Sequence, residues 1–356
     1  MADADLHAAD SYDYDLPRDL VAQEPLADRA AARLLVVNRA DGSLSHRSIR
    51  DLPDLLAPGD LVVVNDTRVV PARLVGRRAK TGGRWEGLFL AATAAGCWTV
   101  LAQSRGRPDF GERVVLTDRA GGDSLELELV GRGDGGAWVV RPLGAAASES
   151  FEAVLARVGR VPLPGYIRGG VEHDGDLDRY QTVFAREAGS AAAPTAGLHF
   201  TPETLAALEA RGVRRAAVTL HVGVGTFRPI TADRLDDHLM HGEWCSCAEE
   251  TVQRVAEARA HGGRVVAVGT TAVRTLETAA RGGTLSPWSG TTDLFIKPGF
   301  PFRVVDILLT NFHMPRTTLM VLVSALASRD LVMRAYAEAI RERYRMLSYG
   351  DAMLIL

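Results

Sequence analysis

Cysteine is scarce in this chain of 356 residues, which has only Cys97, Cys245 and Cys247. The last two are separated by one residue, a spacing that suits neither a disulfide framework nor a four-ligand zinc site, so we expect ordinary thiols. Long apolar runs are also missing, and none approaches the ~20 residues that a membrane-spanning helix needs. A secretory signal peptide begins with a basic region that is followed by an apolar one, whereas the first residues of this chain are acidic. This favours a cytoplasmic protein with no membrane attachment.

Several well-known signatures are absent as well. The chain has no phosphate-binding loop of the type GxxxxGK[ST], no GxGxxG opening a helix after a strand, and no GxSxG nucleophile motif. These absences argue against a nucleoside triphosphate or dinucleotide ligand and against a serine hydrolase. The formal net charge is −3, so no overall positive field attracts a polyanion. Any contact with nucleic acid therefore requires a local basic patch.

Two histidine-containing segments are the most informative feature that is present. Residues 193–200 read APTAGLHF, and residues 221–227 read HVGVGTF. Each combines a histidine with glycines that let backbone approach a ligand, a hydroxyl group and an aromatic ring, which is typical of an active-site floor. For Phe200 and Phe227, packing in the interior is an equally good interpretation. The candidates in these segments are Thr195, Gly197, His199, Phe200, His221, Gly223, Gly225, Thr226 and Phe227.

Apolar periodicity predicts two domains of different texture. Between residues 71 and 147, five short strands separated by glycine turns predict a small antiparallel barrel. Helix and strand patterns alternate on both sides of it. The expected fold class is α/β, with a discontinuous mixed α/β main domain of residues 1–70 and 148–356 and an inserted all-β barrel-like domain of residues 71–147.

The main domain carries clear helix signals. Thr201 caps a helix that starts at Pro202 and that Gly212 ends. Further helices are expected at about 151–158, 248–260, 317–327 and 330–345. Strands are expected at about 61–64, 213–222, 264–268, 293–296, 304–310 and 352–356.

Polar residues stand at the ends of several of these strands, where functional residues often lie. Residues 269–271 form a strand-to-helix junction whose free N–H groups suit a carboxylate or a phosphate. The candidates at such junctions are Asn65, Thr67, Arg68, Thr270, Thr271, Arg274, Asn311, His313, Tyr349 and Asp351.

A metal site is an alternative interpretation. His238, His241 and Glu243 could supply three zinc ligands, which would indicate a hydrolase. The histidines are three apart rather than four, however, and no glutamate lies between them as a general base. We therefore keep the zinc hydrolase as the alternative and predict no metal.

A basic patch is the candidate for nucleic-acid contact. It contains Arg73, Arg77, Arg78, Lys80 and Arg84, interrupted by glycines. Such a cluster suits phosphate groups, and it is equally typical of a solvated hairpin. The patch gains meaning only from a polyanionic substrate.

Over nearly its whole length, the chain resembles the S-adenosylmethionine:tRNA ribosyltransferase-isomerase family of queuosine biosynthesis. The matching segments are residues 14–17, 59–69, 180–184, 193–200, 219–227, 268–274, 298–300, 310–313 and 348–353. The sequence WCSC at 244–247 departs from the family pattern, and the barrel segment matches it only loosely.

The resemblance implies a tRNA-modifying transferase. It implies transfer of the ribosyl moiety of S-adenosylmethionine to 7-aminomethyl-7-deazaguanine at the tRNA wobble position, with isomerisation to epoxyqueuosine and release of adenine and methionine. S-adenosylmethionine is then a substrate, no prosthetic group is needed, and the partner is tRNA. We expect a monomer. A non-catalytic RNA-binding barrel protein is the remaining alternative.

The chemistry of this reaction assigns roles to the candidates without ordering them. His199, His221, His313 and Asp351 are candidates for general base and acid, which the sequence does not apportion. An aromatic ring, best represented by Tyr349, suits the sulfonium, and residues 270, 271 and 274 suit the methionine carboxylate. Asn65, Thr67, Arg68 and Asn311 then position the ribose or the base, and the basic patch contacts tRNA.

Overall fold

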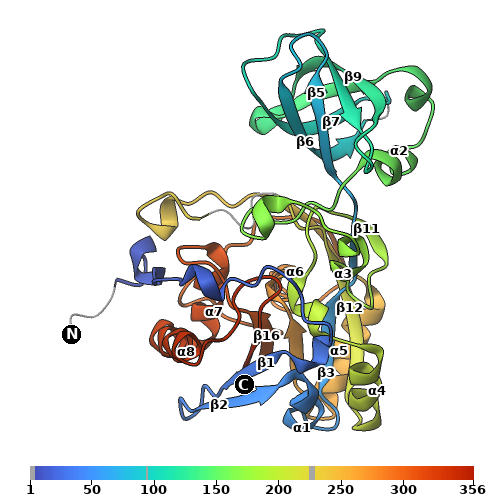
Figure 1. Ribbon diagram of the computed structural model, residues 1–356. Coiled ribbons are helices and arrows are strands. Elements are labelled where there is room, and N and C mark those ends of the chain that lie inside the picture. The colour runs from blue at the N-terminus through green and yellow to red at the C-terminus, as the bar shows by residue number, and fades with distance from the viewer. Residues whose placement is uncertain (1–4, 94, 224–228) are drawn as a thin grey trace. The chain divides into compact units, whose positions relative to one another are not determined.

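A computed structural model describes residues 5–93, 95–223 and 229–356 (Figure 1). The chain forms two compact units. The first comprises Met1–Arg68, Pro164–Gly169 and Arg179–Leu356, and the second comprises Val69–Leu163 and Gly170–Asp178. The first unit is mixed α/β and the second contains a closed barrel, so the predicted fold class is confirmed.

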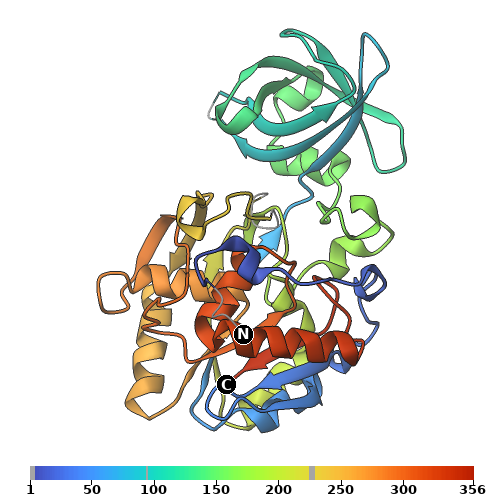
Figure 2. The same ribbon diagram turned by 90° about the vertical axis from the view of Figure 1, so that its left-hand side faces the viewer.

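The barrel closes in the strand order β10-β7-β6-β5-β8-β9, and its curled sheet is seen in Figure 2. Five of its strands were predicted, and the basic segment supplies the sixth. In that strand alternate residues are buried, because Leu74, Gly76 and Arg78 face inward. The strands are β5 Arg73–Arg78, β6 Arg84–Ala92, β7 Trp98–Ser104, β8 Arg113–Thr117, β9 Asp123–Arg132 and β10 Trp138–Pro142.

Helix α2 (Phe151–Val158) belongs to the barrel unit. Its Val154 and Leu155 are buried in the same apolar cluster as Trp85 and Leu116 of the barrel strands. This packing explains why the second unit continues to Leu163, whereas the sequence placed the end of the inserted domain at residue 147.

The described part of the main unit contains a nine-stranded sheet in the order β15-β13-β12-β3-β14-β16-β17-β1-β2. Strands β12, β3, β14 and β16 run parallel to one another, and β17 runs antiparallel to β16. The strands are β1 Arg33–Val37, β2 Leu44–Ser48, β3 Leu61–Asn65, β12 Arg214–Leu220, β13 Glu243–Cys247, β14 Val265–Val268, β15 Trp288–Thr292, β16 Ile307–Asn311 and β17 Ala352–Ile355. A separate pair joins β4 (Thr67–Val69) to β11 (Glu187–Ser190).

Helices cover both faces of this sheet. In β3, Leu61 and Val63 point into one apolar cluster, and Val62 and Val64 point into the other, as the two-residue period of a strand requires. The first face packs against α5 Glu249–Ala260, α6 Thr270–Ala279, α7 Thr318–Ala327 and α8 Arg329–Arg341, and the second against α1 Leu52–Leu55 and α4 Pro202–Ala210. The short helix α3 covers Asp176–Arg179.

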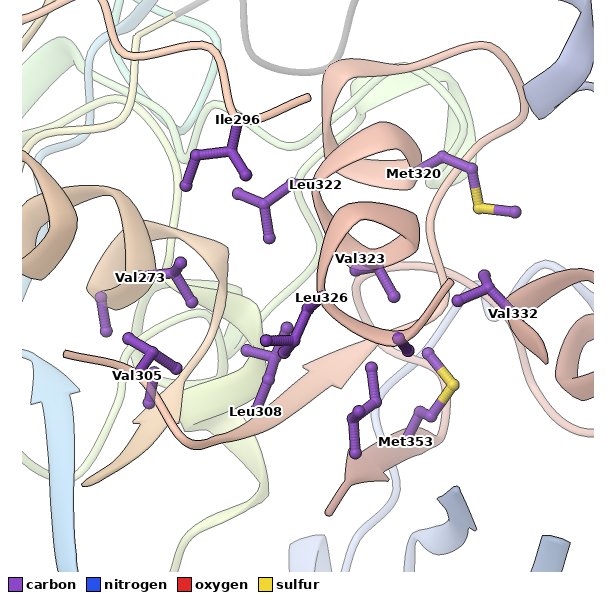
Figure 3. Close-up of a cluster of buried hydrophobic side chains, with 14 of the residues drawn as sticks. Val273, Ile296, Val305, Leu308, Met320, Leu322, Val323, Leu326, Val332 and Met353 are labelled. Carbon is purple, nitrogen blue, oxygen red and sulfur yellow. The ribbon is translucent and has the colours of Figure 1, made fainter. Parts of the chain in front are cut away.

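Figure 3 illustrates the first cluster, where Leu326 of α7 lies beside Leu308 of β16, and Val273 of α6 and Leu322 of α7 belong to the same cluster. This packing fixes α6 against the sheet, and with it the position of the N-terminus of that helix. In the described residues, no helix has both the length and the apolar character required to cross a membrane.

The predicted strand at 293–296 is wrong. Those residues follow β15, which pairs with β13, and neither β13 nor β15 was predicted. The apolar side chains of Leu294 and Ile296 that suggested a strand are buried in the core from an irregular segment instead. Cys245 and Cys247 face inward from β13 as free thiols, and burial raises their pKa values to about 11 and about 12.

Candidate active site

Polar groups gather at one edge of the main sheet. Because β12, β3, β14 and β16 are parallel, their carboxyl ends meet there, which is where α/β sheets bind ligands. This edge carries Asn65, His221, Thr270 and Asn311. The antiparallel β17 starts at the same edge and brings Asp351 to it. The sequence placed these residues at strand ends, and the strand order puts the ends together.

A pocket opens at this edge within the main unit. From the residues predicted for the site, it is lined by Thr195, Thr270, Thr271, Asn311 and His313. Its wall also contains Tyr166 and Ser348, whose hydroxyl groups are 2.8 Å apart. This pocket is the candidate active site.

The N-terminus of α6 forms one side of the pocket. Gly269 has a φ of +85°, a conformation that favours glycine, and its N–H donates to the carbonyl of Leu309 at 2.8 Å. The helix then begins at Thr270, and its first N–H groups have no partner within the helix. The Oγ1 atom of Thr271 is buried and has no hydrogen-bond partner among the described residues. These donors suit an anionic group.

Three side chains form a chain of hydrogen bonds beside the pocket. Thr195 Oγ1 donates to Asn311 Oδ1 at 2.9 Å, and this orientation directs Asn311 Nδ2 toward His199 Nε2 at 3.3 Å. Burial, together with the positive charges of Arg29 and Arg345, lowers the pKa of His199 to about 4. His199 is therefore a neutral imidazole at pH 7 whose Nε2 accepts.

His313 lines the pocket itself. Its Nε2 is 2.9 Å from Thr310 Oγ1, its N–H donates to Tyr336 Oη at 2.8 Å, and its carbonyl accepts from Tyr14 Oη at 2.5 Å. Burial lowers the pKa of His313 to about 3. The ring of His313 is thus neutral, and the residue is fixed by the hydrogen bond of its ring and by those of its backbone N–H and carbonyl.

His221 lies beside the pocket rather than in its lining. Its Nδ1 is 2.8 Å from Thr67 Oγ1, and its ring stacks on Trp244 with the ring centres 5.0 Å apart. Burial lowers its pKa. Asn65 joins two strands, because its side chain donates to and accepts from the backbone of Leu220.

The second histidine segment is described only in part. Gly223 donates its N–H to Glu243 Oε1 at 2.8 Å. Gly225, Thr226 and Phe227 lie outside the described residues. Arg68 is exposed to solvent.

Other predicted residues have structural partners. Both carboxylate oxygens of Asp351 accept backbone N–H groups, from Arg33 at 2.9 Å and Arg345 at 2.8 Å, and burial raises the pKa of this carboxyl. Phe200 is fully buried and packs edge-on against Phe184 in the core, as the packing interpretation expected.

Gly197 and Tyr349 lie on the side of the site where His199 is found. A Cβ atom at Gly197 would lie 2.8 Å from the Phe184 ring, so this glycine permits close packing. Tyr349 lines a shallow pocket together with His199 and Arg29 and meets Tyr180 edge-on.

Arg274 points away from the candidate active site toward a second pocket. Its guanidinium group forms a buried ion pair with Glu243 and donates to the carbonyl of Leu294. The carboxylate of Glu243 is therefore engaged by Arg274 and Gly223. No group of three or more possible ligands in the described residues is placed to hold a metal ion, and His238 packs edge-on against Phe295. Among the described residues, His238, His241 and Glu243 therefore do not form the three-ligand group that the zinc alternative requires.

The basic patch is largely neutralised by neighbouring carboxylates. Arg73 and Arg84 both pair with Glu86, and Arg77 pairs with Asp123. Arg78 is buried and forms a two-pronged ion pair with Glu112 at 2.6 and 2.7 Å. Lys80 is exposed on the same hairpin. As a surface for phosphate, the patch has less free charge than its sequence suggests.

Three residues beside this site, Tyr166, Ser348 and Arg29, were missed from the sequence. Ser348 lies in the segment 348–353 that matches the family, beside Tyr349, whereas Tyr166 lies outside the matching segments, in the proline-rich stretch VPLPGY at 161–166. Arg29 carried no local signal, because its effect depends on His199, which is far away in the sequence. Glu243 was considered only as a possible zinc ligand, and its ion pair with Arg274 is visible only in the structure.

Comparison with known proteins identifies relatives over almost the whole chain. Residues 9–355 match the family model described as queuosine biosynthesis protein. A protein of Symbiobacterium thermophilum is 51% identical over 347 residues, which cover 97% of this chain and 98% of the relative. One from Stenotrophomonas maltophilia is 50% identical over 346 residues, covering 97% of each. Both are named S-adenosylmethionine:tRNA ribosyltransferase-isomerase.

A solved structure is similar as well. The S-adenosylmethionine tRNA ribosyltransferase of Thermotoga maritima is 37% identical, with a TM-score of 0.56, and the match covers 97% of this chain and 100% of that one. The sequence match, the fold and the pocket at the sheet edge agree with one another. The chain belongs to the queuosine biosynthesis family of S-adenosylmethionine:tRNA ribosyltransferase-isomerases.

Proposed function

We propose that this protein transfers the ribosyl moiety of S-adenosylmethionine to 7-aminomethyl-7-deazaguanine at the tRNA wobble position and isomerises it, giving epoxyqueuosine, adenine and methionine. The observation that carries the proposal is the 51% identity, over 97% of the chain, to a protein named S-adenosylmethionine:tRNA ribosyltransferase-isomerase. That name contains the donor, the acceptor molecule and both reaction types. The acceptor base and the products are part of our proposal.

In this proposal S-adenosylmethionine occupies the pocket at the sheet edge, as a substrate. Its methionine carboxylate lies at the N-terminus of α6, where the orphan N–H groups and the hydroxyl of Thr271 donate to it. Arg274 is the fourth residue after Thr270 on the same helix, but its charge is already balanced by Glu243. We therefore assign Arg274 to holding the helix in place.

The reaction needs a base in its unprotonated form, because the sulfonium acidifies the adjacent ribose carbon. His313 lines the pocket, and His199 is hydrogen-bonded to Asn311 in its wall. The low pKa values of both imidazoles, about 3 and about 4, keep them neutral at pH 7. We propose these two as the proton-transfer residues. Asp351 is assigned to anchoring the strand ends, since both of its oxygens already accept backbone hydrogen bonds.

The test incubates the protein with S-adenosylmethionine and tRNA that carries 7-aminomethyl-7-deazaguanine. Mass spectrometry of the digested tRNA should detect epoxyqueuosine, and chromatography should detect an equimolar amount of free adenine. The control is the same tRNA with guanine at the wobble position, which should release no adenine. Binding of the modified tRNA without either product would contradict the proposal and favour the non-catalytic RNA-binding interpretation.

A further inference from the structure

The barrel carries an exposed aromatic residue on a loop that crosses between its strands. Residues 105–112 connect β7 to β8, and the ring of Phe110 in this loop is 67% exposed. One edge of that ring meets Trp138 of β10, with the ring centres 5.8 Å apart. The contact with the buried Trp138 holds the Phe110 ring in place as a flat surface. Exposure of this apolar ring to water is unfavourable, so a partner that covers the ring gains free energy.

The loop is held rigidly by a residue that the sequence had assigned to a different role. Arg78 donates to the carbonyls of Arg105 and Arg107 at 3.1 and 3.4 Å, and its guanidinium group also forms an ion pair with Glu112. At the other end of the loop, Gly111 donates its N–H to the carbonyl of Leu129 on β9 at 2.8 Å. The loop is therefore tied to β5 and to β9, which lie on different sides of β8.

Positive charge is left unbalanced on this loop. Arg105 and Arg107 are exposed, and in the described part of the barrel neither has a carboxylate within ion-pair distance. Arg132 on β9 adds a third guanidinium, which lies 3.5 Å above the Trp138 ring. The loop also contains the exposed carboxylate of Asp109, which forms no ion pair with the residues that the structure describes. The arginines of the predicted basic patch, in contrast, are each paired with an acid.

We infer that this loop surface, defined by Arg105, Arg107, Phe110 and Arg132, binds an unpaired stretch of the tRNA substrate. A base stacks on Phe110, and the guanidinium groups contact the flanking phosphates. Aromatic stacking combined with backbone charge is the physical basis on which proteins hold single-stranded nucleic acid. The inference rests on the proposed function for the identity of the RNA, and it moves the contact surface away from the Arg73, Arg77 and Arg84 side of the hairpin.

Phosphate contact and base stacking make different predictions for salt dependence. Replacing Arg105 and Arg107 with alanine should raise the Kd for tRNA roughly tenfold at low salt and lower the slope of log affinity against log salt by about two, because two phosphate contacts are lost. The Phe110→Ala variant should raise the Kd by roughly tenfold with an unchanged slope, and Phe110→Trp should restore binding.

Fluorescence anisotropy with labelled tRNA carrying 7-aminomethyl-7-deazaguanine measures both quantities. The matched control is Arg113→Ala, an exposed barrel arginine that is already paired with Glu126 and should change neither. A wild-type Kd and slope in the Arg105→Ala, Arg107→Ala and Phe110→Ala variants would overturn the inference, as would a loss of binding in Arg77→Ala alone. Epoxyqueuosine formation by the wild type is measured separately, so failure of the loop surface and failure of the proposed reaction give different results.

Discussion

His199 is the clearest case at the residue scale of a titratable group whose protonation state is set by its surroundings. Its pKa falls from 6.5 to about 4, because burial and then the charges of Arg29 and Arg345 disfavour the protonated ring. A lowered pKa in the folded state means that stability is fully present above pH 6.5 and is lost as the pH falls toward 4. The unfolded chain takes up the proton first in that window.

We predict that this residue contributes about 2 kcal/mol to the loss of unfolding free energy between pH 7 and pH 5. Urea unfolding of the wild type and of His199→Gln at both pH values measures it. The variant should lose less stability on acidification than the wild type. His261→Gln, at the exposed end of α5, is the control, and an equal pH dependence in all three proteins would contradict the prediction.

Arg274 and Glu243 form the second residue-scale case, a buried ion pair. Removing one partner of such a pair leaves a charge without compensation in the interior, which typically costs about 3–5 kcal/mol. We predict that Arg274→Met destabilises the protein by that amount and that the double variant Arg274→Met, Glu243→Met recovers much of the loss. Urea denaturation of the four proteins in a double-mutant cycle measures the coupling. Additive effects of the two single changes would show that the pair does not act as a unit.

At the scale of elements, two threonines of α6, Thr271 and Thr275, differ in their expected roles, the first in binding and the second in structure. The hydroxyl of Thr271 lines the pocket and has no hydrogen-bond partner among the described residues, whereas that of Thr275 donates to the Thr271 carbonyl at 3.0 Å. We predict that Thr271→Val raises the Kd for S-adenosylmethionine about tenfold, because a hydrogen bond to a charged group is worth ~1.5–3 kcal/mol. It should leave the melting temperature almost unchanged, since no protein contact is lost.

The matched change Thr275→Val should give the opposite pattern, with normal S-adenosylmethionine binding measured by calorimetry. If Thr271→Val bound this substrate as the wild type does, the carboxylate would not lie at the N-terminus of α6. A loss of binding by both variants together with a lowered melting temperature would indicate damage to the helix instead.

At the scale of the whole molecule, the two units have separate apolar cores. Leu116 is buried in the barrel core, and Leu322 is buried in the core of the α/β unit. A chain with independent cores commonly unfolds in more than one step. We predict two transitions in differential scanning calorimetry. Leu116→Ala should lower the temperature of only one transition, and Leu322→Ala the temperature of only the other. Each change should reduce the free energy of unfolding of its own unit by the ~2–5 kcal/mol that a buried leucine contributes. A single transition shifted by both changes would contradict this.

Much of the fold was predictable because its signals are local. The N-cap at Thr201, the glycine at 212 and the buried strand predicted at 61–64 each depend on residues adjacent in sequence, and helix α4 and strand β3 confirm them. The strands β13 and β15 were missed because their stability comes from strand pairing, of β15 with β13 and of β13 with β12. The apolar residues Leu294 and Ile296 led to the wrong prediction of a strand at 293–296. Apolar side chains are buried in irregular segments as well as in strands, so their presence does not distinguish the two.

The sequence by itself determined the fold class, the family and several of the segments that form the pocket, because the motifs and apolar periods that indicate them depend on residues close together in the chain. Only the tertiary structure decided which of the candidate residues face the pocket. Asp351, Phe200 and Arg274 are of residue types that are common in functional sites, but each is already engaged by another residue of the protein. Their partners are Arg345, Phe184 and Glu243, respectively. Whether a charge is free is a property of its neighbours in space, and those neighbours come together only when the parallel strands align.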